Sequence, residues 1–194
     1  MSKWRPEDLA GFVRRGAVAL SLVLVLPSLS SAQTAQLISL QLSGLGSAPF
    51  GGGLSGLTVG GGFEAQVRYN PSAFSVGAGV DITFHTVEGA QDRSTTLKGG
   101  FIEPRYVIYI GSDRAAPYAS ARVAVSQTSI EEGTATGTAT GFTLNGGGGV
   151  LLVLNDRTNI DLGATLGFKD VGIVTLPSGT FDLGNGANLI VRLG

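Results

Sequence analysis

Strict alternation of apolar and polar side chains from Phe74 to His85 is the feature that most limits how this chain can fold. Even positions carry Phe, Val, Ala, Val, Ile and Phe, and odd positions carry Ser, Gly, Gly, Asp, Thr and His. A period of two predicts a β-strand with one apolar and one polar face. Because about 9–11 tilted residues cross a bilayer as part of a barrel, and an aromatic ends the apolar face on each side, the pattern favours a membrane-spanning strand.

The first 32 residues have the layout of a cleaved secretory signal peptide. Basic residues precede an apolar run at 16–26, and Ser30, Ser31 and Ala32 supply the small residues expected before cleavage between Ala32 and Gln33. A membrane-anchoring helix is the alternative, but it needs about 20 apolar residues and this run is shorter. We therefore expect a cleaved signal at 1–32 and a single mature domain at 33–194.

Composition narrows the class of the mature chain. It would carry 9 basic and 12 acidic residues, and no basic patch indicates nucleic acid as a partner. The sequence has no cysteine, which excludes a disulfide scaffold, a cysteine–zinc site and a lipid-anchored N-terminal Cys. Only 14% of residues are charged, yet no segment after residue 32 could form a spanning helix. Apolar character dispersed at period two is typical of a transmembrane barrel.

The rest of the sequence repeats the alternation and predicts eight strands. They cover residues 36–44, 57–69, 74–85, 97–110, 117–127, 142–155, 159–169 and 187–194. Long connections, predicted as loops at 46–56, 87–96, 129–141 and 171–185, alternate with short turns at 70–73, 111–114 and 156–158. Outer-membrane barrels show this asymmetry. The predicted fold class is all-β: a single eight-stranded antiparallel up-and-down transmembrane β-barrel with short periplasmic turns and longer outer loops.

Two positions conflict with regular strand pairing. Pro104 lacks the N–H of a ladder hydrogen bond and a closed barrel has no edge, so we expect a bulge or local distortion there. The four glycines at 146–149 weaken the sixth strand pattern. Glycine inside a strand more often marks a bend or a close approach of backbone than a phosphate-binding loop, which would need a following Lys-Ser/Thr and a helix.

Alternation alone does not say which face is inside, because a soluble ligand-carrying barrel has the same period with an apolar interior. The polar face here is rich in Gly, Ser and Thr and carries few charges for a solvated exterior. An eight-stranded barrel has an interior that side chains just fill, so acids and bases in nearly equal number could pair there. The interior polar network predicted in this way consists of Glu64, Arg68, Asp81, Glu103, Arg105, Arg122, Asp161, Lys169 and Arg192.

The chain resembles the small outer-membrane β-barrel family of Gram-negative bacteria, the group with OmpA- and OmpX-like domains. The resemblance covers residues 34–194 and includes the phrases Phe-Ile-Glu-Pro-Arg-Tyr at 101–106 and Ala-Pro-Tyr at 116–118. It implies a location in the bacterial outer membrane, with membrane lipids including lipopolysaccharide and the barrel-assembly machinery as partners. The sequence departs from the family in ending with Gly194, where such barrels commonly end with an aromatic.

Three functions remain open, and the first is the one we predict: a non-enzymatic barrel with a structural or surface-interaction role and no cofactor. The second is a lipid-modifying enzyme, as some barrels of this kind are. Acyl transfer needs a hydroxyl beside an oriented histidine, and His85, the only histidine, lies about 13 Å along its strand from Asp81 with no His-x-Ser phrase. The third is a narrow, porin-like pore for small solutes, because glycines thin the lumen-facing wall.

Overall fold

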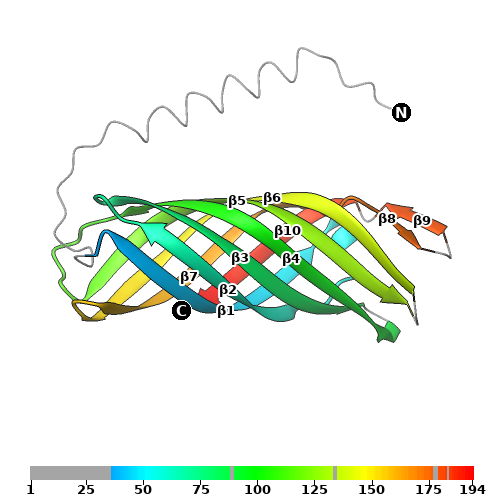
Figure 1. Cartoon of the computed structure of the whole chain (residues 1–194), viewed down its shortest axis with the longest axis horizontal. Coiled ribbons are helices and arrows are strands. Elements are labelled where there is room, and N and C mark those ends of the chain that lie inside the picture. Colours follow the sequence, from blue (N-terminus) through cyan, green and yellow to red (C-terminus); the bar gives the residue numbers. More distant parts are fainter. Residues whose placement is uncertain (1–35, 88–89, 133–134, 177–178, 183) are drawn as a thin grey trace, which may run out of the picture.

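The computed structural model describes residues 36–87, 90–132, 135–176, 179–182 and 184–194 (Figure 1). The predicted signal peptide and its cleavage site between Ala32 and Gln33 lie outside the described residues. In the described part of the chain, no helix has the length and apolar character needed to cross a membrane.

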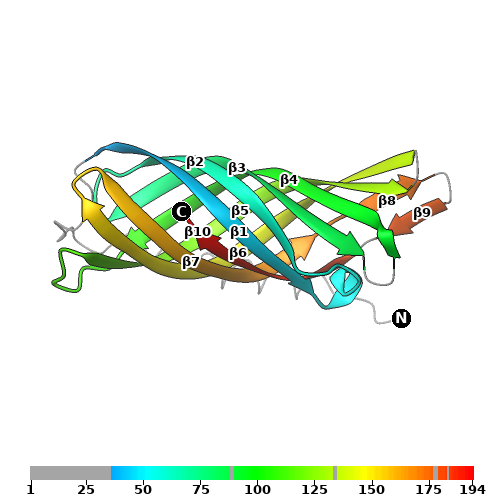
Figure 2. The ribbon, with the colours of Figure 1, turned by 90° about the horizontal axis from the view of Figure 1, so that it is seen from below.

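Within the described residues, eight long strands close into one antiparallel barrel (Figures 1 and 2). They are β1 (Ile38–Phe50), β2 (Gly60–Tyr69), β3 (Phe74–Val87), β4 (Ala90–Val107), β5 (Ala115–Glu132), β6 (Ala135–Asn155), β7 (Thr158–Asp170) and β10 (Asn185–Leu193). The order around the barrel is β1-β10-β7-β6-β5-β4-β3-β2. Each barrel strand therefore pairs with the barrel strands that precede and follow it in the chain, and the last, β10, pairs with the first, β1. The predicted eight-stranded up-and-down barrel is confirmed.

Each strand turns apolar side chains outward and polar side chains inward. Every barrel strand carries a large apolar side chain that is more than half exposed: Leu40, Phe63, Val80, Ile102, Val125, Leu144, Leu166 and Val191. The buried side chains of the described residues comprise 21 polar or charged ones and 12 apolar ones. Soluble proteins have the reverse distribution. The described residues therefore exclude the alternative of a barrel with an apolar interior.

The two ends of the barrel differ. At one end the connections are the turns at 70–73, 108–114 and 156–157. At the other end, β1 is followed by the short 3-10 helix η1 (Gly52–Leu54), and β7 is followed by a separate hairpin of β8 (Ile173–Leu176) and β9 (Gly179–Asp182). Figure 1 shows this hairpin at the right-hand end of the barrel. The two ends of the barrel therefore differ as predicted, but the long connections contain a 3-10 helix and a hairpin where loops were predicted.

Much of what the sequence predicts as loop is strand. β1 continues to Phe50 instead of ending at residue 44, β4 begins at Ala90, and the β5–β6 ladder runs to the pair Glu132–Ala135. The predicted loop at 171–185 contains β8 and β9. Most of these segments are rich in Gly, Ser, Thr and Ala, and β8 and β9 are only four residues long each, so hydropathy does not reveal them, whereas backbone hydrogen bonding needs only a neighbouring strand in register.

Of the bulge or local distortion expected at Pro104, the structure shows a local distortion: the pairs with β5 are interrupted at Glu103 and Pro104, and no bulge is present. On the β5 side, Ile102 pairs with Val123 and Arg105 with Ser120, so the register is the same before and after the proline. On the β3 side, Pro104 lies opposite Val76 in an unbroken register. The missing N–H therefore interrupts the ladder locally without inserting a residue.

Candidate functional site

Nine charged side chains enter the barrel interior from six strands. They are the nine residues predicted for the interior polar network: Glu64 and Arg68 on β2, Asp81 on β3, Glu103 and Arg105 on β4, Arg122 on β5, Asp161 and Lys169 on β7, and Arg192 on β10. Eight of them are at most 7% exposed, and the Asp81 side chain is 18% exposed. Taking a charge out of water costs several kcal/mol, roughly, unless a partner and further hydrogen bonds compensate it.

Glu103 is fully buried and lies at the centre of the network. Its Oε1 accepts hydrogen bonds from Arg68 and Arg105, each at 2.9 Å, and its Oε2 accepts one from Arg192 at 2.8 Å. Arg68 is on β2 and Arg192 is on β10, so this carboxylate joins strands that are far apart in the sequence. Charge-assisted hydrogen bonds of this kind are roughly twice as strong as neutral ones.

Asp161 is the second acceptor that several strands share. The hydroxyl of Tyr118 donates to its Oδ1 at 2.6 Å. Its Oδ2 accepts from Gln41 at 2.8 Å and from Arg105 at 2.9 Å. Because Gln41 lies on β1 and Arg105 also bonds Glu103, the two carboxylates and the arginine form one continuous chain across the lumen.

Arg122 holds the remaining two acids. Its Nη1 donates to Glu64 and its Nη2 donates to Asp81. Arg192 also reaches Glu64, at 3.2 Å, which links this group to Glu103. Eight of the nine charged residues therefore form one connected network and not a set of separate pairs.

Lys169 does not take part as predicted. It is 7% exposed and forms no ion pair or hydrogen bond with any residue that the structure describes, so the expected pairing with an acid is absent. It lines a cavity of about 20 Å³ together with Asp81 and Arg122. A cavity of that size holds about one water molecule, which could solvate the ammonium group.

Reasoning about charges alone misses the aromatic and amide members of the network. The guanidinium of Arg105 lies 3.9 Å from the ring centroid of Tyr118, and that of Arg122 lies 3.5 Å from the ring centroid of Phe101. These contacts suit the cation–π geometry. The alternation along each strand could have revealed both rings. Tyr118 lies four residues before the inward-facing Arg122 on β5, and Phe101 lies two residues before the inward-facing Glu103 on β4, so each ring also faces inward.

Two lumen-facing glycines make room for the network. A Cβ at Gly163 would lie 2.4 Å from the Tyr118 hydroxyl oxygen and 3.3 Å from Nη2 of Arg192. A Cβ at Gly77 would lie 2.3 Å from the Gln66 side-chain oxygen and 2.8 Å from Nη2 of Arg68. Any larger residue at these positions would displace a group that bonds a buried carboxylate or its partner.

His85 faces the interior and is 3% exposed. Its Nδ1 lies 2.9 Å from the carbonyl oxygen of Thr58, and its Nε2 lies 3.1 Å from the hydroxyl oxygen of Thr83. In the tautomer with the proton on Nδ1, the ring donates to the carbonyl and accepts from the hydroxyl. The pair resembles a hydroxyl nucleophile beside a histidine base. Both side chains are buried inside the barrel, so neither is exposed to a substrate outside it. Among the described residues, no group of three or more His, Asp or Glu side chains could hold a metal ion.

The fold and the site define a class of protein: a small closed antiparallel barrel of eight strands with an apolar exterior and paired charges inside. The structure is similar to that of Neisserial surface protein A (NspA), at 18% identity and a TM-score of 0.56, covering 81% of this chain and 94% of that chain. It is also similar to the N-terminal β-barrel domain of Pseudomonas aeruginosa OprF, at 16% identity and a TM-score of 0.45, covering 81% and 97%. No protein-family model and no curated protein matches the sequence. At the level of the fold, the likeness to NspA confirms the predicted kind of barrel.

Replacing Glu103 by Gln should destabilise the barrel strongly. The change leaves three buried arginines around a neutral amide, and breaking a buried ionic contact costs about 3–5 kcal/mol. We expect the free energy of unfolding, measured by denaturant titration of the refolded full chain in detergent micelles, to fall by that amount. Asp113→Asn, in an exposed short turn, is the matched control and should change it by less than about 0.5 kcal/mol. Equal stability of the two variants would contradict the central role of Glu103.

Gly163→Ala should also destabilise the barrel, by about 1–3 kcal/mol, because the added methyl group collides with the Tyr118 hydroxyl. Gly146→Ala on β6 is the control, since a Cβ there has no atom within 4 Å. The same denaturant titration compares the two variants. A Gly163→Ala variant as stable as Gly146→Ala would show that the interior is loosely packed.

Proposed function

We propose that this chain is a non-enzymatic integral outer-membrane β-barrel with a structural or surface-interaction role. The observation that carries the proposal is the pairing of an apolar exterior on all eight described barrel strands with a charged, hydrogen-bonded interior. In a bilayer, backbone groups must be satisfied within the protein, and a closed barrel does so. In this proposal residues 1–32 direct export, the barrel-assembly machinery inserts the chain, and lipids including lipopolysaccharide surround the apolar band.

The height of the apolar band supports the proposal. On β3, the outward positions run from Phe74 at the short-turn end to Phe84, and Phe84 is 51% exposed. Ten residues at a rise of about 3.3 Å and a tilt of about 40° span about 25 Å along the barrel axis, which is the usual height of the band in outer-membrane barrels. The aromatic rings at its two ends suit the two membrane interfaces.

The end opposite the short turns is the part of the molecule available for surface interaction. β4, β5 and β6 continue there, and the β8–β9 hairpin lies at the same end in Figure 1. On the extensions of β5 and β6, the polar side chains of Gln127, Thr138 and Thr140 are exposed. Under the proposal, this end projects from the outer face of the membrane as a polar extension of the barrel wall.

The interior network weighs against the alternative of a narrow pore. Glu103 and Asp161 receive arginines from opposite walls, so their side chains occupy the cross-section through which a solute would pass. An eight-stranded barrel is only just wide enough for such side chains. Passage would require several charge-assisted hydrogen bonds to open together.

The membrane location can be tested by fractionation of cells that express the full chain, with gel migration before and after boiling. We expect the protein in the outer-membrane fraction and a boiled sample that migrates differently from an unboiled one. Val123→Arg places a charge in the middle of the apolar band and should cost about 2–4 kcal/mol in a bilayer. Thr138→Arg, on the polar extension of β6, is the matched control and should fold like the wild type. Recovery of the wild type in a soluble fraction would contradict the proposal.

Acyl transfer through Thr83 is the second candidate, because the Thr83–His85 pair is the only feature of the described residues that resembles an activated nucleophile. Burial of both side chains inside the barrel keeps a lipid substrate from reaching them. We therefore expect Thr83→Ala and His85→Ala to leave the lipid A profile of expressing cells, measured by mass spectrometry, identical to that with the wild type. Loss of a lipid A modification in either variant would favour the enzyme.

A further inference from the structure

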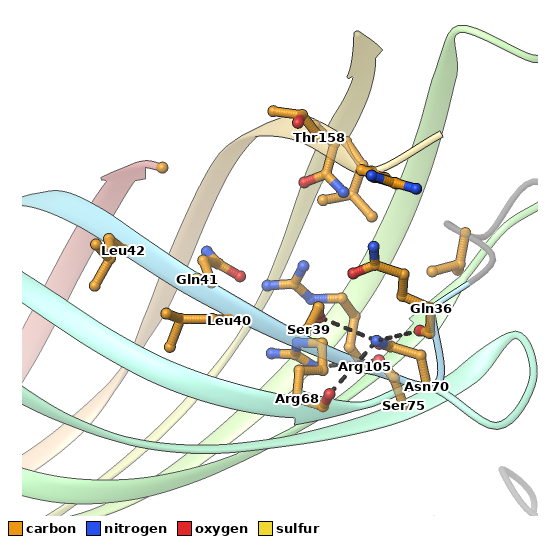
Figure 3. Close-up of a pocket in the computed structure, with 15 residues that line it drawn as sticks. Gln36, Ser39, Leu40, Gln41, Leu42, Arg68, Asn70, Ser75, Arg105 and Thr158 are labelled. Carbon is orange, nitrogen blue, oxygen red and sulfur yellow. Dashed lines mark hydrogen bonds between the residues drawn. The ribbon is translucent and has the colours of Figure 1, made fainter. Parts of the chain in front are cut away.

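A cavity of about 330 Å³ opens at the short-turn end of the barrel (Figure 3). Three of the side chains that line it are arginines, Arg68, Arg105 and Arg157, and none is acidic. Figure 3 shows Arg68 and Arg105 beside the polar side chains of Ser39 and Asn70, with the Asn70 amide donating to Ser39 at 3.0 Å. The cavity is therefore a cationic, polar recess in the mouth of the barrel.

The three arginines of this recess differ in how many of their guanidinium N–H groups are hydrogen-bonded within the protein. Arg68 bonds with both terminal nitrogens. Arg105 is 2% exposed, and its bonds to Glu103 and Asp161 both use Nη2, which leaves Nη1 and Nε without a partner among the described residues. Arg157 lies in an exposed turn, and its guanidinium forms no ion pair in the described part of the chain. The recess is thus lined by one largely buried guanidinium, whose Nε is inaccessible and whose Nη1 is the donor left for a ligand, and by the exposed guanidinium of Arg157.

The balance of charge supports an anionic occupant. The nine interior charges comprise five bases and four acids, and each acid is already in contact with at least one arginine. Arg157 adds a further positive charge at the mouth. The forked guanidinium matches the oxygens of a phosphate or carboxylate with two parallel hydrogen bonds.

The same cavity has an apolar side. Leu40 and Leu42 on β1 line it, and they remain 70% and 66% exposed on the outer surface of the barrel. A ligand in the recess can therefore touch guanidinium groups with one end and the apolar band with the other. This combination fits an amphiphile with an anionic head.

We propose that this recess binds the phosphate of a phospholipid headgroup from the membrane leaflet on the short-turn side. Arg105 and Arg157 contact the phosphate oxygens, and an acyl chain lies along Leu40 and Leu42 on the outside. The proposal rests on the membrane location proposed above, since only that location brings lipid to the recess. It assigns the barrel a defined lipid site in addition to the general contact of its apolar band.

Native mass spectrometry of the refolded full chain in detergent tests the site, with phosphatidylglycerol as the probe. Diacylglycerol with the same acyl chains lacks the phosphate, and glycerol phosphate lacks the chains, so the three probes separate the contributions of head and tail. We expect phosphatidylglycerol to bind the wild type and to bind Arg157→Gln about ten-fold more weakly, as the loss of one charge-assisted contact predicts. Arg114→Gln, in another exposed turn at the same end, is the matched control and should bind like the wild type.

Several results would overturn the inference. Equal binding to the wild type and Arg157→Gln would remove the site, and equal loss in Arg114→Gln would reduce it to a general attraction to positive charge. Glycerol phosphate binding as tightly as the lipid would assign the recess to a soluble phosphate compound. Fractionation of the protein away from the membrane would contradict the proposed function, whereas a membrane protein with no difference between the variants would contradict this inference alone.

Discussion

Ionised side chains removed from water are the constraint on which the rest of this barrel depends. Glu103 is fully buried, and only the three arginines that converge on its two oxygens make that position tolerable. Those arginines come from β2, β4 and β10, so the wall must bring these strands around one point. The lumen-facing glycines follow from the same requirement, because Gly163 leaves the space in which Tyr118 and Arg192 meet. The apolar exterior sets where the barrel can reside, and the charged interior sets which closed shape it takes.

The alternation along each strand predicts which side chains face the interior. It does not predict which of them meet, because the sequence does not give the register between strands. Alternation places Glu103, Arg105 and Arg192 on the inward face from the sequence alone. It does not say that Arg192 meets Glu103, because the two are 89 residues apart and come together only when β10 and β1 close the barrel. Lys169 shows the limit clearly: its parity is right, yet no acid of the described residues lies within ion-pair distance of it.

The lengths of the strands were less predictable than their number. Hydropathy detects a strand only where one face is apolar, so the prediction ended near the edge of the apolar band. At 135–141, Thr at the even positions alternates with Ala and Gly at the odd positions, so neither face carries large apolar side chains, and the structure pairs 129–132 and 135–141 as continuations of β5 and β6. At Pro104 the local rule is partly right, since the β4–β5 pairs are interrupted at Glu103 and Pro104 while the register on both sides stays the same. Pairing with neighbouring strands therefore limits the effect of the proline to these two positions and extends the strands at 129–132 and 135–141.

The spread of the network over the chain has a consequence for the order of assembly. Through Gln41, Arg68, Asp81, Glu103, Arg122, Asp161 and Arg192, hydrogen bonds join β1, β2, β3, β4, β5, β7 and β10. Glu103 lacks Arg192 until β10 has folded against the rest of the barrel, and Asp161 lacks Gln41 until the last strand has met the first. A half-closed sheet would leave buried charges without their protein partners, and water is then the group that must solvate them, so the interior loses most of its water in the step that closes the wall.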